Sequence, residues 1–411
     1  DSSNATLVND KATHVKSTRF SIHFSNYVLV LRTVLIICIF CKQMEPIHLI
    51  VVGRLYSGLG LSALPVIRKI SSLYPNISLY FADSVQDIQK IPEISQISCA
   101  LYIPRGYLDV LSYLIDHATS LKWIHSWVVG VDPIASVIKE KLIGSDIVLT
   151  NARGAFSTSL AEWVFAASFH FVKEIPRIME NTKRCNWDVF PMEQLHGKTM
   201  GFLGFGDIAK ATARLAKMFG MKVIACRKCD KDDHKDLVDE IYLFSNDGIA
   251  KVLTAGDIIV CSLPATDETK KCLNYEKFYL MKSNAVFLSI GRGSVIVEND
   301  LAKVTENYGL YKNVKMLQNC RKILKEKIIC GAALDVFEFE PLDETSPLWN
   351  LPNILITAHN ADREPGYDAM SYQVWVRNVN AFLKGARCEE EFVTPLQNFL
   401  YMHSNEFNYV H

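Results

Sequence analysis

A glycine-rich turn between an apolar run and a helical pattern constrains this fold more than any other feature of the sequence. Gly204 and Gly206 permit a tight bend and a close approach of the backbone to a pyrophosphate, while Ala209 lets the following helix pack near the strand. The pattern predicts a strand, the turn, a helix and a second strand at residues 199–203, 204–209, 208–219 and 221–226. This order is typical of a dinucleotide-binding βαβ unit, in which the first N–H groups of the helix face the phosphates.

The end of the second predicted strand bears on which dinucleotide is bound. Enzymes that use NAD commonly have an acidic residue there, about 20 residues past the glycines, to hold the ribose 2′-hydroxyl. This chain has Arg227 followed by Lys228, and a guanidinium suits a 2′-phosphate that a carboxylate would repel. We therefore expect NADP(H) to be preferred. NAD(H) stays possible, because Asp230, Asp232 and Asp233 follow closely and a shifted alignment would restore an acid.

The composition is that of a globular enzyme. Hydrophobic residues make up 49% of the 411 residues, enough for two domains with packed cores. Lys plus Arg and Asp plus Glu both number 44, so no net charge favours nucleic acid as a partner. The 11 cysteines show no framework spacing, and we interpret Cys226-x-x-Cys229 as incidental rather than as a metal or redox motif. We expect no metal site, reduced thiols and a cytoplasmic location.

Residues 1–45 differ from the rest and are interpreted as an N-terminal extension. Their apolar run, residues 27–41, is interrupted by Arg32 and is shorter than the roughly 20 residues that cross a bilayer, so we expect no membrane span. Three interpretations stay open: a signal or anchor segment, an organelle-targeting extension, or sequence upstream of a start at Met44. The last is favoured, because a predicted strand over 47–52 begins just after Met44.

Strand and helix patterns alternate along the rest of the chain. The remaining predicted strands lie at 47–52, 78–81, 99–103, 121–125, 147–149, 257–263, 285–290, 331–336 and 354–358, and the remaining predicted helices at 61–73, 107–116, 134–142, 157–173 and 367–382. Such alternation predicts parallel sheets with helices on both faces. We expect an α/β fold of two doubly wound parallel-sheet domains, a Rossmann-type cofactor domain and a flavodoxin-like substrate domain.

Three side chains with complementary chemistry follow the last three predicted strands. Because ligands bind outside the carboxyl ends of parallel strands, we expect Arg292, Glu340 and His359 to meet beside the cofactor. Arg292 would grip the carboxylate of a 2-oxo acid and polarise its carbonyl. His359 would protonate the carbonyl oxygen, and Glu340 would orient the imidazole. Each also has a structural interpretation: a surface charge for Arg292, a turn residue for Glu340, and a capping or packing residue for His359.

The sequence resembles the D-isomer-specific 2-hydroxyacid dehydrogenases, and the glyoxylate/hydroxypyruvate reductases among them, over about residues 46–385. The similar segments are 126–132, 204–209, 263–269, 291–294, 331–341 and 359–361. The resemblance implies that Arg292, Glu340 and His359 are the catalytic residues, and that the protein is a homodimer. Together with the turn, it implies a cofactor-binding set of Gly204, Gly206, Asp207, Ile208, Arg227, Lys228, Leu263, Pro264, Ile290, Asp335 and Ala361.

The resemblance also implies substrate contacts and a domain division. Val129 and Gly130 would offer backbone N–H groups to the substrate carboxylate, and Arg105 is a further substrate candidate. The expected parts are a substrate domain over 46–151 and 364–386, a dinucleotide-binding domain over 152–363, and a C-terminal tail over 387–411.

Two features depart from the family pattern. Asp207 stands in the glycine turn where a neutral or basic residue is common, and its charge would weaken pyrophosphate binding unless it points away. The interval from Arg292 to Asp335 is longer than the family usually has, and we expect the surplus at about 305–322. This insertion is interpreted as an exposed loop or as a retained stretch from a faulty gene model.

The sequence therefore predicts an NADP(H)-preferring oxidoreductase that acts on a small 2-oxo or 2-hydroxy acid such as glyoxylate or hydroxypyruvate. A phosphoglycerate dehydrogenase-like enzyme is the nearest alternative. A second alternative is a nucleotide-sensing, corepressor-like scaffold that binds partners instead of turning over substrate.

Overall fold

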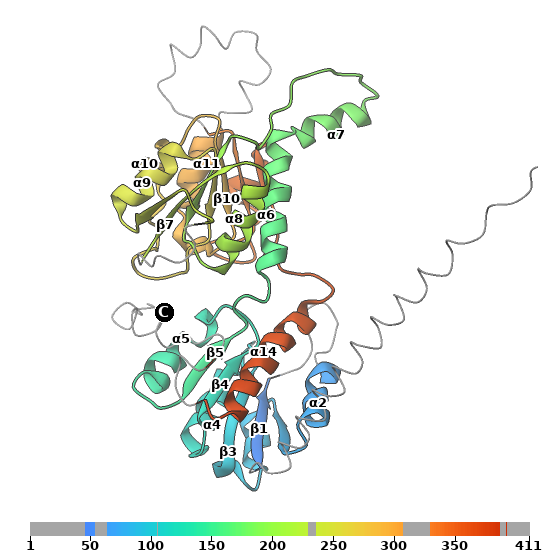
Figure 1. Cartoon of the computed structure of the whole chain (residues 1–411), viewed down its shortest axis with the longest axis vertical. Helices are drawn as coiled ribbons and strands as arrows, with labels where there is room; N and C mark the ends of the chain where they lie inside the picture. The colour runs from blue at the N-terminus through green and yellow to red at the C-terminus, as the bar shows by residue number, and fades with distance from the viewer. Residues whose placement is uncertain are drawn as a thin grey trace, which may run out of the picture.

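The computed structural model describes residues 46–53, 64–104, 106–228, 236–306, 329–386 and 392. They form two parallel sheets, each covered by helices on both faces, which make the lower and upper lobes of Figure 1. The predicted α/β fold with two parallel-sheet domains is confirmed. The N-terminal extension, Arg105 and all of the expected C-terminal tail except Phe392 lie outside the described residues.

The first sheet has the strand order β2-β1-β3-β4-β5, which is the flavodoxin-like order. All its neighbouring strands are parallel. The strands are mostly apolar and, apart from the edge strand Ile77–Ala82, almost fully buried, as expected where both faces of a parallel sheet are covered. They are β1 (Ile47–Val52), β2 (Ile77–Ala82), β3 (Ile97–Tyr102), β4 (Trp123–Ser126) and β5 (Val148–Asn151).

Two helices from distant parts of the chain cover one face of this sheet. The helix α14 (Tyr367–Leu383) returns from the C-terminal half and packs against α2 (Leu64–Leu73). Trp375 of α14 is fully buried in this layer, and Tyr74 donates a 2.7 Å hydrogen bond to Asn380. The opposite face is covered by α3 (Val85–Gln89), α4 (Leu108–His117), and the turns α5 (Ala135–Val137) and η3 (Ile138–Leu142).

The second sheet has the order β12-β11-β10-β9-β6-β7-β8. Counted from β6 as the first strand, this is the Rossmann order 3-2-1-4-5-6 with a seventh strand added. All its pairings are parallel. The strands are β6 (Thr199–Leu203), β7 (Lys222–Arg227), β8 (Glu240–Leu243), β9 (Ile258–Cys261), β10 (Val286–Ser289), β11 (Gly331–Leu334) and β12 (Ile354–Ile356).

Helices also cover both faces of the second sheet. One face packs against α6 (Ser157–Val172) and α8 (Asp207–Met218). The other packs against α9 (Asn246–Ala255), α10 (Tyr275–Tyr279), α11 (Glu298–Glu306) and η5 (Pro347–Asn350). Close packing of α9 on β6 requires Gly201, because a Cβ there would lie 2.8 Å from a methyl of Val252. The remaining short elements are η1 (Ile94–Gln96), η2 (Asp132–Ile134), α7 (Ile175–Lys183) and η4 (Gly293–Val295).

The sequence patterns differ from the structure in several places, and they do not predict the helices α3, α7, α9 and α10. Residues 134–142 were predicted as one helix, but they form the end of η2 followed by α5 and η3. The apolar spacing that predicted a helix here reflects burial, since Ile134, Val137, Ile138 and Leu142 are all buried. The patterns also miss β8, which pairs with β7 alone among the described strands and is partly exposed along its length.

The expected insertion falls mostly on residues 307–328, which lie outside the described residues. Its first two residues, Thr305 and Glu306, end α11. The N–H of Ile329 donates a 3.3 Å hydrogen bond to the carbonyl of Val304, so the described chain resumes beside the point where it stops. No helix in the described ranges is both long enough and apolar enough for a bilayer crossing.

Candidate active site

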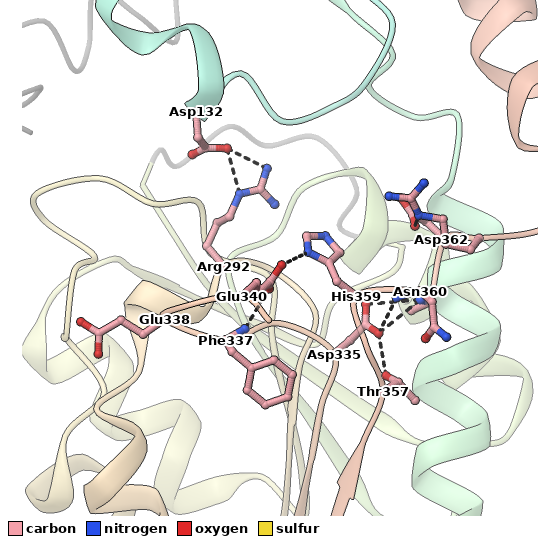
Figure 2. Close-up of polar contacts among 12 residues, drawn as sticks. Asp132, Arg292, Asp335, Phe337, Glu338, Glu340, Thr357, His359, Asn360 and Asp362 are labelled. Carbon is pink, nitrogen blue, oxygen red and sulfur yellow. Dashed lines mark hydrogen bonds and ion pairs between the residues drawn. The ribbon is translucent and has the colours of Figure 1, made fainter. Parts of the chain in front are cut away.

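Three neighbouring strands of the second sheet bring the predicted catalytic side chains to one edge. The strands β10, β11 and β12 lie side by side and parallel, so their carboxyl ends meet. Arg292 follows β10, Glu340 lies beyond β11 and His359 follows β12. Figure 2 shows the three side chains gathered there, pointing toward the N-terminal domain.

The side chains of Glu340 and His359 form a hydrogen-bonded ion pair. Nδ1 of His359 lies 2.7 Å from Oε2 of Glu340, and the other carboxylate oxygen accepts a 3.0 Å hydrogen bond from the N–H of Phe337. Burial opposes ionisation of Glu340. The hydrogen bonds from His359 and Phe337, with the charges of His359 and Arg292, outweigh burial and hold the pKa of Glu340 below its usual value.

The same pair raises the pKa of His359. The hydrogen bond to Glu340 is the largest cause, and it outweighs the opposing effect of burial. Because an ionised carboxylate can only accept, Nδ1 carries the proton in this hydrogen bond. Nε2 is then the ring nitrogen left for a substrate, and it donates a proton when the imidazole is charged.

A buried aspartate fixes the backbone that carries the imidazole. His359 adopts the left-handed conformation with φ of +49°, which is unfavourable for a residue other than glycine. The carboxylate of Asp335, only 2% exposed, accepts hydrogen bonds from the Thr357 hydroxyl at 2.6 Å and from the N–H groups of Asn360 and Ala361 at 3.1 and 3.2 Å. The carbonyl of Asp335 accepts the N–H of His359 at 2.9 Å. Asp335 therefore organises this turn, and its expected contact with the cofactor stays a prediction.

Arg292 reaches across to the other domain, where residues 126–132 resemble the substrate loop of the family. Its Nε and Nη2 both lie 3.0 Å from Oδ2 of Asp132, and Nη1 donates to the carbonyl of Gly291 at 2.9 Å. A Cβ on Gly130 would stand 2.3 Å from Nη2, so the loop backbone lies directly against the guanidinium. The carbonyl of Val129 accepts a 2.6 Å hydrogen bond from the amide of Asn151, which ties the loop to β5.

The glycine turn has the shape that a dinucleotide requires. Gly204 adopts a left-handed φ of +86° and packs against residues 262–263, where a Cβ would come within 3.3 Å of its neighbours. Gly206 immediately precedes α8, and among the described residues no atom lies within 4 Å of a Cβ built on it. The space before the first N–H groups of α8 is therefore open, and it suits an anionic pyrophosphate.

An arginine from the segment between β5 and α6 balances the acid in this turn. Nε of Arg153, which lies between β5 and α6, is 2.8 Å from Oδ2 of Asp207, the first residue of α8. The negative charge that would oppose a pyrophosphate thus has a partner, and a guanidinium stands beside the turn. Both charges can be seen in the sequence, but no local pattern indicates that residues 153 and 207 contact each other.

The remaining predicted cofactor residues lie around the same sheet edge. Arg227 is the last residue of β7 and is 8% exposed, and Lys228 follows it and donates a 3.0 Å hydrogen bond to Glu268. Leu263 and Ile290 are buried just beyond the ends of β9 and β10. Ile208 and Pro264 are partly exposed beside the glycine turn, and Ala361 is buried after β12.

The sheet order, the open glycine turn and the Arg–Glu–His edge together define an NAD(P)-dependent oxidoreductase of the Rossmann type.

Comparison with known proteins gives the family. A family model for the D-isomer specific 2-hydroxyacid dehydrogenase, NAD binding domain, matches residues 165–312 and 318–361. The chain is 29% identical over 295 residues to a D-3-phosphoglycerate dehydrogenase of Methanocaldococcus jannaschii, covering 71% of this chain and 51% of that protein. It is 28% identical over 278 residues to a glyoxylate reductase of Korarchaeum cryptofilum, covering 66% of this chain and 76% of that protein.

A solved structure agrees with both matches. The D-isomer specific 2-hydroxyacid dehydrogenase family protein from Aeromonas salmonicida superposes with a TM-score of 0.63 at 27% identity, covering 85% of this chain and 99% of that one. The chain is similar to members of the D-isomer-specific 2-hydroxyacid dehydrogenase family of NAD(P)-dependent enzymes, and the three comparisons support that family. It spans about half the length of the phosphoglycerate dehydrogenase that it matches.

Proposed function

We propose that this protein reduces a small 2-oxo acid, such as glyoxylate or hydroxypyruvate, with NADPH. The observation that carries the proposal is the hydrogen-bonded pair of His359 and Glu340 beside Arg292, at the sheet edge that also holds the glycine turn. A proton donor, its orienting carboxylate and a carboxylate-binding cation are what the reduction of a 2-oxo acid requires.

The proton comes from the charged imidazole. The glycine turn at Gly204 and Gly206 would hold the cofactor, whose nicotinamide would supply a hydride to the carbonyl carbon as the electrons of the C=O double bond move to oxygen. Nε2 of His359 gives its proton to that oxygen, completing the 2-hydroxy acid and leaving a neutral imidazole. Glu340 stabilises the charged imidazole before transfer and fixes its orientation throughout, because Nδ1 stays bound to it.

Arg292 orients the substrate in this proposal. Its guanidinium presents several N–H donors to the substrate carboxylate and stabilises negative charge that develops on the carbonyl oxygen. The backbone of Gly130 lies against the same guanidinium, so the N–H groups of Gly130 and of its neighbour Val129 are suited to share the carboxylate. Val129, Gly130 and Arg105 remain predicted substrate residues, and Arg105 lies outside the described residues.

The preference for NADPH rests on Arg227 and Lys228. Arg227 ends β7, the strand whose end faces the adenosine ribose in the Rossmann order. A guanidinium and an ammonium at this place favour a 2′-phosphate. Lys228 is held by Glu268 at 3.0 Å, so we assign the larger share of the preference to Arg227.

Phosphoglycerate oxidation is the second candidate, and the similarity to a phosphoglycerate dehydrogenase is the observation that favours it. That substrate carries a phosphate as well as a carboxylate, and the described substrate loop presents Asp132 rather than a second cation near Arg292. A small monocarboxylic substrate therefore fits the described edge better.

We also propose a homodimer. The helix α7 projects from the upper lobe in Figure 1, and the segment after it exposes large apolar side chains. Trp187 is 93% exposed and Val189 is 85% exposed, although Asp188 between them is fixed by Arg177 at 2.7 Å. An ordered apolar surface of this kind favours a protein partner. A second copy is the partner that the family resemblance implies.

The domain division and the compartment are proposals too. The contacts of α14 with α2 and with the first sheet support a discontinuous substrate domain over 46–151 and 364–386, around the dinucleotide-binding domain over 152–363. A cytoplasmic location remains the expectation from the cysteine pattern.

The experiment mixes the full-length protein with NADPH and with glyoxylate, hydroxypyruvate or 3-phosphohydroxypyruvate. The reaction is measured as the loss of NADPH absorbance. We expect turnover of one of the first two, and a loss of about 10²–10⁴ in kcat for His359→Asn. His117→Asn changes an exposed histidine at the end of α4 and should leave kcat unchanged. NADPH binding with no turnover of any substrate would contradict the proposal and favour the scaffold.

A further inference from the structure

A carboxylate of the chain already lies on the guanidinium that the proposed reaction needs. Oδ2 of Asp132 contacts both Nε and Nη2 of Arg292 at 3.0 Å. Paired donors of this kind are how a guanidinium binds a carboxylate ligand. Because Nη1 of Arg292 also donates to Gly291, much of the donor capacity of the side chain is used within the protein. Figure 2 shows Asp132 approaching Arg292 from the opposite domain.

The same place suits the substrate carboxylate. A Cβ on Gly130 would lie 2.3 Å from Nη2 of Arg292 and 3.1 Å from Oδ2 of Asp132, so the loop backbone touches both members of the pair. Asp132 starts η2 only two residues after Gly130. Its carboxylate therefore enters the site from the loop whose N–H groups are expected to hold the substrate.

The pair is weak enough to be displaced. The side chains of Arg292 and Asp132 are 32% and 41% exposed, and ion pairs that accessible shift an equilibrium by about fivefold at most. A substrate carboxylate that binds Arg292 and also accepts backbone hydrogen bonds makes more interactions than Asp132 does. After displacement, the Asp132 carboxylate stays tethered beside the substrate carboxylate, and like charges repel.

We propose that Asp132 is an internal competitor for Arg292. It holds the guanidinium when the site is empty, the carboxylate of the 2-oxo acid displaces it, and its charge lowers the affinity of the site for anions. The proposal rests on the proposed function, in that it takes Arg292 as the carboxylate-binding residue. Asp132 thereby determines substrate affinity without taking part in the proton or hydride transfer.

The test measures oxalate binding to the NADPH-loaded full-length protein by calorimetry, together with the KM for glyoxylate. Asp132→Asn keeps the size of the side chain and removes the charge. We expect oxalate to bind about two- to fivefold more tightly and the KM to fall by a similar factor. Asp132→Glu keeps the charge and should stay near the wild-type affinity. Asp146→Asn, an exposed change in the same domain, should leave both values unchanged.

The sign of the change decides the role of Asp132. Weaker oxalate binding and a higher KM in Asp132→Asn would show that Asp132 positions Arg292, and would overturn the proposal. Unchanged binding, or no oxalate binding by either protein, would overturn it too. If the wild type reduces neither glyoxylate nor hydroxypyruvate while Asp132→Asn still binds oxalate more tightly, the reductase proposal fails and the competition at Arg292 stands.

Discussion

Nδ1 of His359 and Oε2 of Glu340 lie 2.7 Å apart, although the two residues are 19 positions apart and follow different strands. The contact exists because β11 and β12 are parallel neighbours that end at the same sheet edge. It sets the protonation of both groups in opposite directions, lowering the pKa of Glu340 and raising that of His359.

Glu340→Gln should move the pH dependence of reduction to lower pH. The hydrogen bond to Glu340 is the main cause of the raised pKa of His359, so removing the charge lowers that pKa. Reduction needs the protonated imidazole, so its rate is lost as pH rises through the His359 pKa. The variant should lose activity at lower pH than the wild type in a profile of kcat/KM for glyoxylate. Glu338→Gln removes a neighbouring carboxylate that pairs with Lys271 and should keep the wild-type profile.

Asp335→Ala should destabilise the protein and slow catalysis together. The change leaves the N–H groups of Asn360 and Ala361 and the hydroxyl of Thr357 without their buried acceptor. An unsatisfied buried donor costs about 1–3 kcal/mol, so we expect at least that loss in the free energy of unfolding measured in urea. Thr357→Val removes one of these hydrogen bonds and should cost about 1 kcal/mol. A normal kcat in Asp335→Ala would show that the turn carrying His359 does not depend on this carboxylate.

The sequence predicts which residues follow the strand ends, but it does not predict which charged residues from distant segments contact one another. Arg292, Glu340 and His359 could be placed at one edge because parallel strands impose that arrangement, whatever the detailed packing. The contact of Asp132 with Arg292 depends on how the two domains face each other, and the contact of Arg153 with Asp207 depends on how the segment after β5 packs beside the glycine turn. No local pattern encodes either arrangement, so only the structure reveals these partners.

The backbone conformation of the turn that carries His359 could not be predicted from the sequence either. A positive φ is expected at glycine, and the sequence has His359 there, held by the buried carboxylate of Asp335. Asp335 was predicted as a cofactor residue from the family resemblance alone. The sequence does not predict the edge strand β8, because its four residues, one glutamate followed by three apolar or aromatic side chains, are too few to show a strand period.

Arg153→Met should weaken NADPH binding by leaving Asp207 unbalanced beside the pyrophosphate. The two side chains are 2.8 Å apart and partly exposed, so we expect about a two- to fivefold rise in the Kd. Asp207→Asn in the same chain should restore most of that loss, because the repelling charge is gone. The four proteins form a double-mutant cycle measured by NADPH fluorescence. Additive effects would show that the two charges act on the cofactor independently.

Trp187→Glu should convert the proposed dimer into a monomer. The side chain is 93% exposed on the segment after α7, and a carboxylate buried in an apolar interface would be strongly unfavourable. Light scattering coupled to size exclusion gives the mass directly. Trp349→Glu alters another exposed tryptophan, in η5, and should leave the mass unchanged. A wild-type monomer, or a variant that remains dimeric, would reject this surface as the interface.

Arg227→Asp should reverse the cofactor preference. The change replaces a guanidinium at the end of β7 with the carboxylate that holds the ribose 2′-hydroxyl in NAD enzymes, and that repels a 2′-phosphate. Hydrogen bonds to charged groups contribute about 1.5–3 kcal/mol, so the NADPH/NADH ratio of kcat/KM should fall by about 10- to 100-fold. Arg214→Asp makes the same change on the exposed side of α8 and should keep the ratio. A ratio that stays constant in Arg227→Asp would show that another group recognises the 2′-position, with Lys228 the next residue to substitute.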